Sequence, residues 1–540
     1  MTTTPTTPTT PRPSMMKAPG EGSTRLLEAM GVGVGVGGPV HETAPASGET
    51  VALTHETAPA RVSLGEQSAL RRASRQLRAL YDAAQTDREN SRHWANADQL
   101  SANSANSPAV RQTLRSRARY ETANNSYARG IVNTIADYVI GTGPRLQLLL
   151  DAKLAADARR VETEFARWAV AVGLAHKLWT LRVSQAESGE GFGLLAGNPT
   201  LPTRVTLDLR LLEADQVATP YMAMRAMVDP YAVDGIEFDR FGNPSTYHIL
   251  RAHPGQLSVM GSLPNEYDRV GAGSVVHLFR AERPGQARGI PELTPALPLF
   301  ALLRRYTLAV LTASENAADI SGVIYTDSPG DEADEVSPLD EFDIDRGTWL
   351  TMPAGWKTSQ MKAEQPVSTY DQFKKSVLNE IARAMGMPYN IAAGNSEGYN
   401  YSSGRLDHQA FFRFVQVDRQ RIEAAVLDRV FRAWLDEATL IEGYLPQSVR
   451  TRELVPHQWF WPGLEHVDPA KEALAQSVRL ANGTATLADE CARQGRDWEE
   501  VIRQRAREIH LCNELGVPLP PAVASAAQIE AVTRDEEARP

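Results

Sequence analysis

The chain has 540 residues, 42% of them hydrophobic, and a net charge of -10 at pH 7. This length predicts several structural units with enough apolar side chains for a core. The negative charge excludes a generally basic nucleic-acid binder. The two cysteines, Cys491 and Cys512, argue against a disulfide scaffold or a cysteine zinc site and suit a reducing cytoplasm. No apolar run approaches the roughly 18 residues of a membrane span, and no signal peptide pattern is found, so we expect no membrane partner.

Both ends of the chain have the composition of disordered segments. Residues 1–63 contain Thr/Pro repeats, a Gly-Val run and a duplicated HETAPA at His41–Ala46 and His55–Ala60. Such segments bury too little apolar surface to offset chain entropy. Gly33–Gly38 fits GxGxxG, but no strand precedes it and Pro39 follows it, so a dinucleotide site is not predicted. Residues 519–540 are also predicted to be disordered.

Two arginine-rich helices are predicted after residue 64. The first has an apolar stripe with Leu70, Leu77 and Leu80, and the second continues to Gly141. Their arginines could bind phosphate, but we favour a solvated helix face or ion pairs across a subunit contact. The arginines of the second helix are Arg111, Arg115, Arg117, Arg119 and Arg129.

The middle of the chain predicts a mainly helical α+β protein. A helix near residues 152–172 precedes short β-type runs, in which His277 is interpreted as a packed or edge residue. The predicted strands are Val205–Leu212, Gly235–Phe238, Thr246–Ile249 and Val275–Phe279. Ser188-Gly189-Glu190-Gly191 is interpreted as a turn.

Long helices dominate the rest of the chain. Apolar periodicity predicts helices over 298–320, through Phe373 to Met385, and through Ile422 to Trp434. The last hundred residues read as helices separated by glycines. Between the first two helices lie an apolar run, Thr348–Met352, and nine carboxylates without Lys or Arg between Asp327 and Asp345. This acidic stretch is interpreted as a solvated loop, with repulsion or orientation of DNA or a partner as the alternative.

No recognisable catalytic motif occurs. The sequence lacks a P-loop, an HExxH pair and a Gly-x-Ser-x-Gly elbow, so we predict no catalytic residues, metal site or cofactor. An enzyme, such as a prophage-encoded nuclease or protease, would need a site scattered through the sequence. The function must therefore be inferred from architecture.

Several motifs resemble, in order, those of lambda-type portal proteins of tailed bacteriophages. They are Arg115–Arg119, Asn124–Gly130, Val139–Gly143, Glu213–Asp215, Gly235–Asp239 with Gly242–Pro244, Arg283–Pro291, Gly386–Tyr389, Asn400–Arg405, Trp461–Gly463, Asp468–Glu472 and Gly495–Asp497. Each motif is weak alone, but their number and order support the resemblance, which covers residues 64–518.

The resemblance implies a portal fold divided into wing, stem, clip and crown. The implied parts are a wing at 64–290 with a long helix at 404–438, stem helices at 291–320 and 369–386, a clip at 321–368, a channel loop at 387–403 and a C-terminal helical crown at 439–518.

The resemblance also implies a homo-oligomeric ring, a dodecamer, at one capsid vertex of the virion, assembled in the host cytoplasm. Its implied partners are the terminase large subunit, the major capsid protein, head-completion and tail connector proteins, and double-stranded DNA without sequence specificity. The residues expected to contact DNA in the channel are Tyr399, Asn400, Tyr401, Ser402 and Ser403, with packing of the two tyrosines against the stem as the alternative. Arg405 is expected to start the next helix.

Overall fold

The computed structural model describes residues 88, 91–220, 231–256, 266–319, 323–326, 356–359, 370–452, 454–463 and 469–517. The chain divides into two compact units, Met1–Ala97 and Asp98–Pro540. The first predicted helix and the low-complexity termini lie outside the described residues, as do Thr348–Met352 and the acidic stretch. The elements described here belong to the second unit.

The predicted second arginine-rich helix is two helices. After a short helix, α3 (Ala102–Ala105), the chain forms α4 (Pro108–Asn124) and α5 (Ser126–Ile140). Asn125 separates them because its backbone is extended and its side chain accepts hydrogen bonds from the Tyr127 and Ala128 amides. This is N-cap geometry, so a new helix begins there. The helix ends before Gly141, as predicted.

A second helical pair follows. The predicted helix near 152–172 is confirmed as a 3-10 turn (Ala152–Leu154) and α6 (Ala155–Ala171), and α7 (Leu174–Ser188) follows directly. The sequence did not predict α7, because its buried face carries Arg182, Gln185 and Ser188 among the leucines. Polar groups on the inner face interrupt the apolar period by which a helix is recognised.

Two antiparallel sheets follow α7, and the four predicted strands are confirmed within them. The first sheet has the order β3 (Leu207–Leu212), β2 (Glu190–Gly197), β8 (Val275–Phe279). The second has the order β4 (Ala232–Val233), β5 (Ile236–Phe238), β6 (Pro244–Leu250), β7 (Tyr267–Gly271). A small core of Phe192, Leu212, Val217, Ile236, Tyr247, Ile249 and Val275 joins them.

The central strand β2 was missed, and its first residues were interpreted as a turn. Gly189 does turn the chain, with a φ of 87°. Glu190 and Gly191, however, already pair with Phe279 and Leu278 of β8. A β-carbon at Gly193 would lie 2.6 Å from the Leu209 side chain. The glycines that weaken the strand pattern are thus required by close packing.

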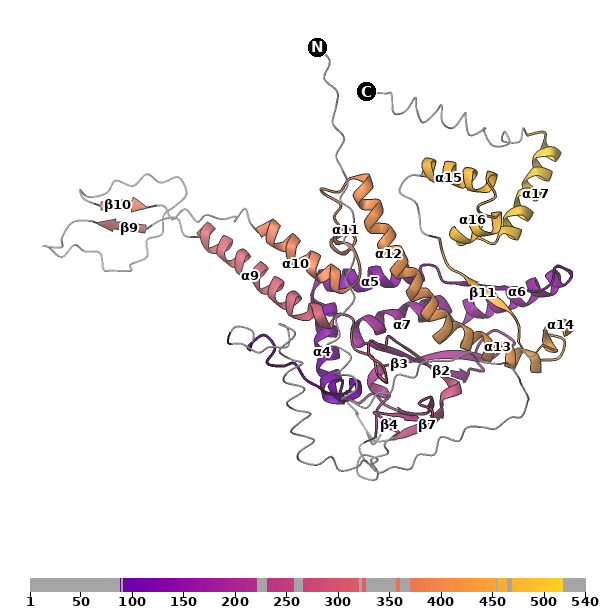
Figure 1. The fold of residues 1–540 in the computed structure, drawn as a ribbon, viewed down its shortest axis with the longest axis horizontal. Coiled ribbons are helices and arrows are strands. Elements are labelled where there is room, and N and C mark those ends of the chain that lie inside the picture. The colour runs from indigo at the N-terminus through magenta and orange to yellow at the C-terminus, as the bar shows by residue number, and fades with distance from the viewer. Residues whose placement is uncertain are drawn as a thin grey trace, which may run out of the picture. The chain divides into compact units, whose positions relative to one another are not determined.

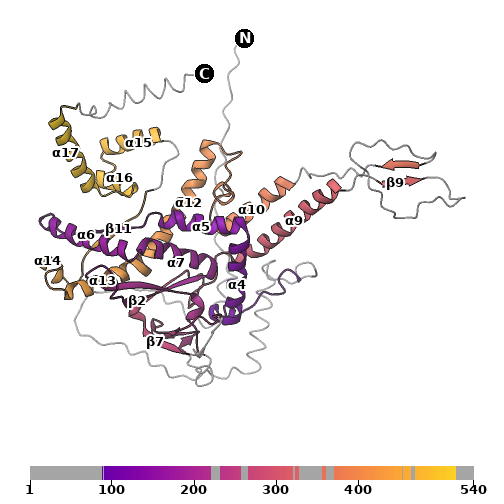
Figure 2. The same cartoon turned by 180° about the vertical axis from the view of Figure 1, so that it is seen from behind.

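The helices α9 (Leu297–Asp319) and α10 (Tyr370–Ala384) extend away from this α+β part, whereas α12 (Tyr401–Ile422) leads into a helix beside the first sheet, as Figure 1 shows. These elements confirm the predicted helices, and α12 continues through a π-helical turn (Glu423–Leu427) into α13 (Asp428–Leu440). α9 and α10 lie side by side in Figures 1 and 2. Tyr306 of α9 stacks on Tyr370 and contacts Phe373 of α10. Near residues 321–368 the described chain holds one hairpin, β9 (Val323–Thr326) with β10 (Trp356–Ser359).

One described helical segment, Thr294–Glu315, is long and apolar enough to cross a membrane by length and composition. The sequence analysis did not identify it. Arg304 and Arg305 lie in its middle. Charged groups at that depth of a bilayer are costly, so we interpret the apolar surface as a protein contact.

The interval 439–518 is not purely helical, which corrects the prediction. It begins with α14 (Gln447–Arg450) and contains β11 (His457–Phe460), which pairs with β1 (Arg145–Leu148). Figure 2 shows β11 beside α6. The later helices are as predicted, separated by Gly483 and Gly495 and ended by Gly516: α15 (Pro469–Ala481), α16 (Leu487–Arg493) and α17 (Trp498–Leu515).

Gly289→Ala should destabilise the fold strongly, because a β-carbon there would lie 2.0 Å from the Gly189 carbonyl oxygen. Backbone atoms cannot move aside as a flexible side chain can. We therefore expect the free energy of unfolding to fall by about 3 kcal/mol. Gly404→Ala is the matched control, since a β-carbon at that helical position meets nothing within 4 Å. It should stabilise by about 0.5–1 kcal/mol. Urea unfolding midpoints measure both, and equal midpoints would contradict the close approach.

Candidate functional site

The segment between α10 and α12 is more ordered than the predicted loop at 387–403. α10 ends at Ala384, and Gly386 turns the chain with a φ of 68°. Met385 and Met387 on either side are buried. A short helix, α11 (Tyr389–Ala393), follows and ends at Gly394. The segment is therefore held by buried side chains where it leaves α10, and it is largely exposed at residues 394–400.

α12 begins at Tyr401, four residues before the predicted start at Arg405. The Asn400 side chain accepts a hydrogen bond from the Ser403 amide at 2.8 Å, and the Ser403 hydroxyl accepts one from the Asn400 amide at 3.2 Å. This reciprocal pair is a capping box. The sequence prediction missed it because the polar run Asn-Tyr-Ser-Ser reads equally well as a loop.

Three of the five residues expected to contact DNA have partners inside the chain. Asn400 and Ser403 cap α12. Burial and a hydrogen bond with the Asp407 carboxylate raise the pKa of Tyr399. Tyr401 and Ser402 lie in the first turn of α12. The exposed positions are Asn395, Ser396, Glu397, Gly398 and Asn400, most of which the sequence analysis did not single out.

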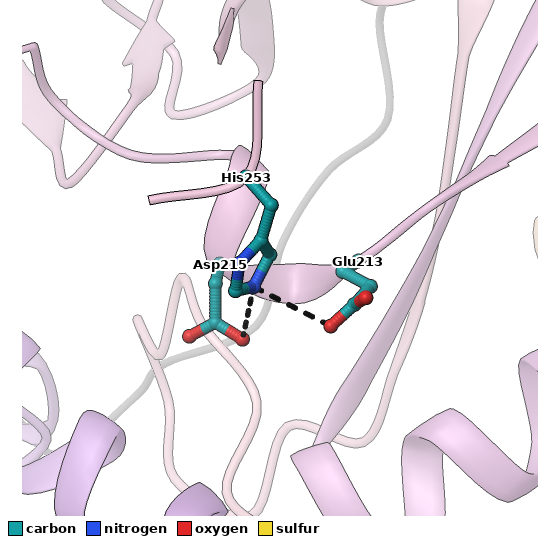
Figure 3. A group of neighbouring side chains, drawn as sticks. All are labelled: Glu213, Asp215 and His253. Atoms are coloured by element: carbon teal, nitrogen blue, oxygen red, sulfur yellow. Dashed lines mark ion pairs between the residues drawn. The ribbon is translucent and has the colours of Figure 1, made fainter. Parts of the chain in front are cut away.

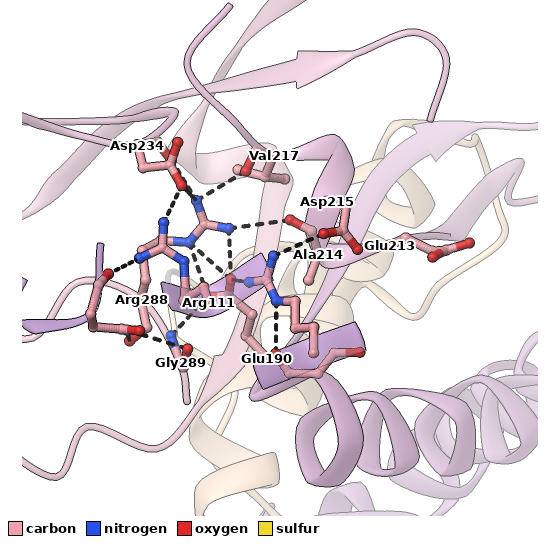
Figure 4. A network of polar contacts seen from close by, with 12 residues as sticks. Arg111, Glu190, Glu213, Ala214, Asp215, Val217, Asp234, Arg288 and Gly289 are labelled. Carbon is pink, nitrogen blue, oxygen red and sulfur yellow. Dashed lines mark hydrogen bonds and ion pairs between the residues drawn. The ribbon is translucent and has the colours of Figure 1, made fainter. Parts of the chain in front are cut away.

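A buried ionic network centred on Glu190 lies in the α+β part of the chain (Figure 4). Glu190 begins β2 and is fully buried. Arg288 donates to it from Nε at 2.9 Å and from Nη2 at 2.6 Å, and Arg115 donates from Nη2. His277 Nε2 and the Gly289 amide both lie 3.0 Å from Oε2. One carboxylate thus joins α4, β2, β8 and the segment before α9.

Two further carboxylates complete the network. Asp234 lies in the Asp-Gly turn between β4 and β5 with a φ of 38°, and it accepts from Arg111 and Arg288. Asp-Gly suits such tight hairpin turns. Asp215 accepts from Arg115 at 3.3 Å and pairs with Arg119 at 2.7 Å. The three buried arginines are therefore matched by three carboxylates.

The network keeps its charges. Burial opposes ionisation of Glu190, but Arg288, His277 and Arg115 hold its pKa well below the ordinary value of 4.5. Burial lowers the pKa of His277, so the imidazole is neutral at pH 7. Burial works against the charge of Arg288 as well, yet Glu190 and Asp234 raise its pKa.

The interpretation of Arg111 and Arg115 as solvated or as subunit contacts is wrong. Both are buried, with relative exposures of 1% and 5%, and both bind carboxylates of their own chain. Arg117 and Arg129 are exposed, as expected of a solvated face. Sequence could not distinguish them, because the carboxylates that bind Arg111 and Arg115 lie 75 or more residues away.

Two other arginines attach α12 to the core. Buried Arg182 of α7 donates to Asp418 of α12 at 2.6 Å and to Glu292, just before α9, at 2.9 Å. Arg419 donates to the Val139 and Tyr138 carbonyls at the end of α5. Cations favour that end of a helix dipole. α12 is thus fixed to both α5 and the start of α9.

A cluster of Glu213, Asp215 and His253 offers ligand atoms within 4.8 Å of one another (Figure 3). His253 Nδ1 accepts a hydrogen bond from the Gly255 amide at 3.0 Å, so Nε2 carries the proton. Nε2 lies 3.4 Å from Glu213 and 3.7 Å from Asp215. Arg119 also pairs with both carboxylates. Arg119 therefore supplies the counter-charge for both carboxylates of the cluster.

Known proteins match the chain over most of its length. A family model described as phage portal protein, lambda family, matches residues 87–419. The probable portal protein of Halomonas phage phiHAP-1 is 28% identical over 451 residues, covering 79% of this chain and 85% of that protein. Portal protein B of Escherichia phage lambda is 26% identical over 172 residues, covering 31% of this chain and 32% of that protein. A structure described as the neck of an empty GTA particle has a TM-score of 0.44 and 18% identity, covering 71% of this chain and 93% of that one.

The fold and the family match define a mainly helical α+β protein with a portal fold. The matched residues, 87–419, contain the Glu190 network, α9, α10 and the segment that leads into α12. The chain belongs to the lambda family of phage portal proteins.

Glu190→Gln should destabilise the protein by about 3–5 kcal/mol at pH 7, because it leaves buried guanidinium groups without their counter-charge. The folded-state pKa of Glu190 is lowered, so its contribution is complete above pH 4.5 and is lost as the pH falls through the folded-state value. The difference in free energy of unfolding between wild type and variant should therefore shrink in acid. Urea unfolding across this pH range measures it.

Asp268→Asn is the matched control, because Asp268 pairs with Arg251 at 2.8 Å on the surface. Water screens exposed ion pairs, so little change is expected. A Glu190→Gln variant as stable as this control at pH 7 would contradict the central role of Glu190.

Proposed function

We propose that copies of this chain form the ring through which double-stranded DNA enters and leaves a phage capsid. Membership of the lambda portal family over residues 87–419 is the observation that carries the proposal. The ring would be a dodecamer at the capsid vertex of the virion, assembled in the host cytoplasm. The chain itself would be a conduit and not an enzyme.

The apolar surface of α9 supports a ring. Leu302, Leu308 and Leu311 are 53–55% exposed in the single chain, and Phe373 of α10 is 44% exposed. Apolar side chains grouped along one helix pair mark a contact surface. A ring needs a head-to-tail contact between different surfaces of neighbouring copies, and α9 would supply one of them.

The segment between α11 and α12 supports a weak contact with DNA. Its exposed end presents Asn395, Ser396 and Asn400, whose amide and hydroxyl groups can hydrogen-bond phosphate oxygens. It carries no Lys or Arg between residues 394 and 404. Within this segment, the lack of cationic side chains means little salt-dependent affinity for phosphate. Tyr399, Asn400, Tyr401, Ser402 and Ser403 remain our proposed contact region.

We propose that the chain is divided as the resemblance to portal proteins implies. The wing would comprise 64–290 with the helix at 404–438, and α9 and α10 would form the stem. The clip at 321–368 would bind the terminase large subunit and later the head-completion and tail connector proteins. The wing and the crown at 439–518 would adjoin the major capsid protein and the capsid interior.

Negative-stain imaging of the purified protein should show annular particles with a central hole. The exposed leucines of α9 provide the reason, since they need a partner surface. Compact monomers that cut DNA or protein with added divalent metal would contradict the conduit and favour the enzyme.

Asn400→Asp should reduce retention of linear DNA by the rings without loss of stability. Asp caps a helix as well as Asn does, so the added charge is the change that matters. A carboxylate at this exposed position, repeated around the ring, would repel phosphates. Retention is measured by nuclease protection of DNA bound to purified rings.

Ser101→Asp is the matched control, because Ser101 is also an exposed N-cap and receives the same charge. DNA retention should be unchanged in that variant. Equal retention by both variants would place the segment away from DNA.

A further inference from the structure

The exposed face of α12 carries an uninterrupted set of uncharged and cationic groups. We name as the α12 stripe four exposed residues at helical spacing, Arg405, Gln409, Arg413 and Gln416. Steps of three and four residues place these side chains on one side of a helix. The stripe starts directly after the capping box of Asn400 and Ser403.

The stripe lacks the ion pairs found along three other helices, although exposed arginines without a partner among the described residues also occur on α4 and α5. Lys375 pairs with Asp371 on α10, Arg167 with Glu164 on α6, and Arg503 with Glu499 on α17. Pairs three or four residues apart are the usual arrangement on a solvated helix. Among the described residues, Arg405 and Arg413 have no hydrogen-bond or ion-pair partner, although the whole chain has a net charge of -10.

Carboxylates are absent from this face because α12 directs its two away from it. Asp418 is buried and binds Arg182 and Arg421. Asp407 is partly buried and takes part in the hydrogen bond with Tyr399. The exposed face of the helix therefore carries no carboxylate, and beside the α12 stripe it also exposes the apolar side chains of Leu406 and Val417.

We propose that the α12 stripe binds the phosphate backbone of double-stranded DNA, extending the contact region at 399–403 along the helix. The proposal rests on the proposed DNA conduit. Arg405 and Arg413 are eight residues apart, or about 12 Å along a helix. This is close to the major-groove width of about 12 Å, so the two guanidinium groups can contact the strands on either side of one groove. Gln409 and Gln416 add neutral donors, which contact phosphates without counterion release.

The stripe also corrects our view of Arg405. The sequence analysis assigned it a structural position at the start of a helix. In the structure it lies in the second turn, exposed, with the capping done by Asn400 and Ser403. Its guanidinium group has no ion-pair partner among the described residues, and a phosphate is a partner whose chemistry fits it.

The test uses purified full-length rings and a fluorescent linear duplex, with affinity measured by anisotropy over a series of salt concentrations. Arg405→Gln/Arg413→Gln should weaken binding. It should also reduce the slope of log affinity against log salt by about 0.9 per lost phosphate contact, about 1.8 for the pair in one subunit. Arg117→Gln/Arg129→Gln removes the same charge from exposed, unpaired arginines on α4 and α5 and should leave the slope unchanged.

Each other outcome overturns the proposal in a distinct way. Wild-type rings that bind DNA with the same slope as the stripe variant would exclude the stripe while leaving the conduit intact. Smaller particles of the stripe variant in light scattering would show that the stripe is a contact between copies. An equal loss of DNA affinity in the control variant would show that the effect comes from net charge and not from the position of the arginines. If the wild-type protein binds no linear DNA, both the proposed DNA conduit and the proposed DNA contact of the α12 stripe would be contradicted.

Discussion

The buried carboxylate of Glu190 is the constraint on which the rest of the α+β part depends. Its two oxygens accept hydrogen bonds from Arg288, Arg115, His277 and the Gly289 amide. A buried ion pair contributes little net stability, because desolvation offsets the attraction. What it provides is geometry, since every partner must be in place before the charge can be buried. The helix α4, both sheets and the chain leading to α9 are thus fixed together.

Buried ion pairs also connect the α+β part to the long helices. Glu292, four residues after Arg288, binds Arg182, which also binds Asp418 in the middle of α12. Arg419, the next residue, is fixed to the end of α5. The helix α12, which follows the polar segment, is therefore oriented by buried ionic contacts with α7 and α5.

In the motifs that carry the family resemblance, the glycines allow close packing of backbone segments and the buried arginines form ion pairs. Gly289 and Gly189 allow two backbones to touch, and Gly495 lies against the backbone of Trp461 to Gly463. Arg115 and Arg288 form ion pairs with Glu190, which the sequence pattern placed in a turn. The portal assignment is confirmed by the family match, although sequence alone could not show which partners these residues have in three dimensions.

Sequence by itself determined the family, the mainly helical α+β class and most helices and strands, because those depend on local periodicity and on short motifs. It missed α7 and β2, whose buried faces carry arginine, glutamine and glycine in place of an apolar pattern. It also placed the start of α12 four residues late. Only the tertiary structure decided which arginines are buried and which are free, because their partners lie far away in the sequence. That decision separates Arg111 and Arg115, which hold the fold, from Arg405 and Arg413, which are available to a phosphate.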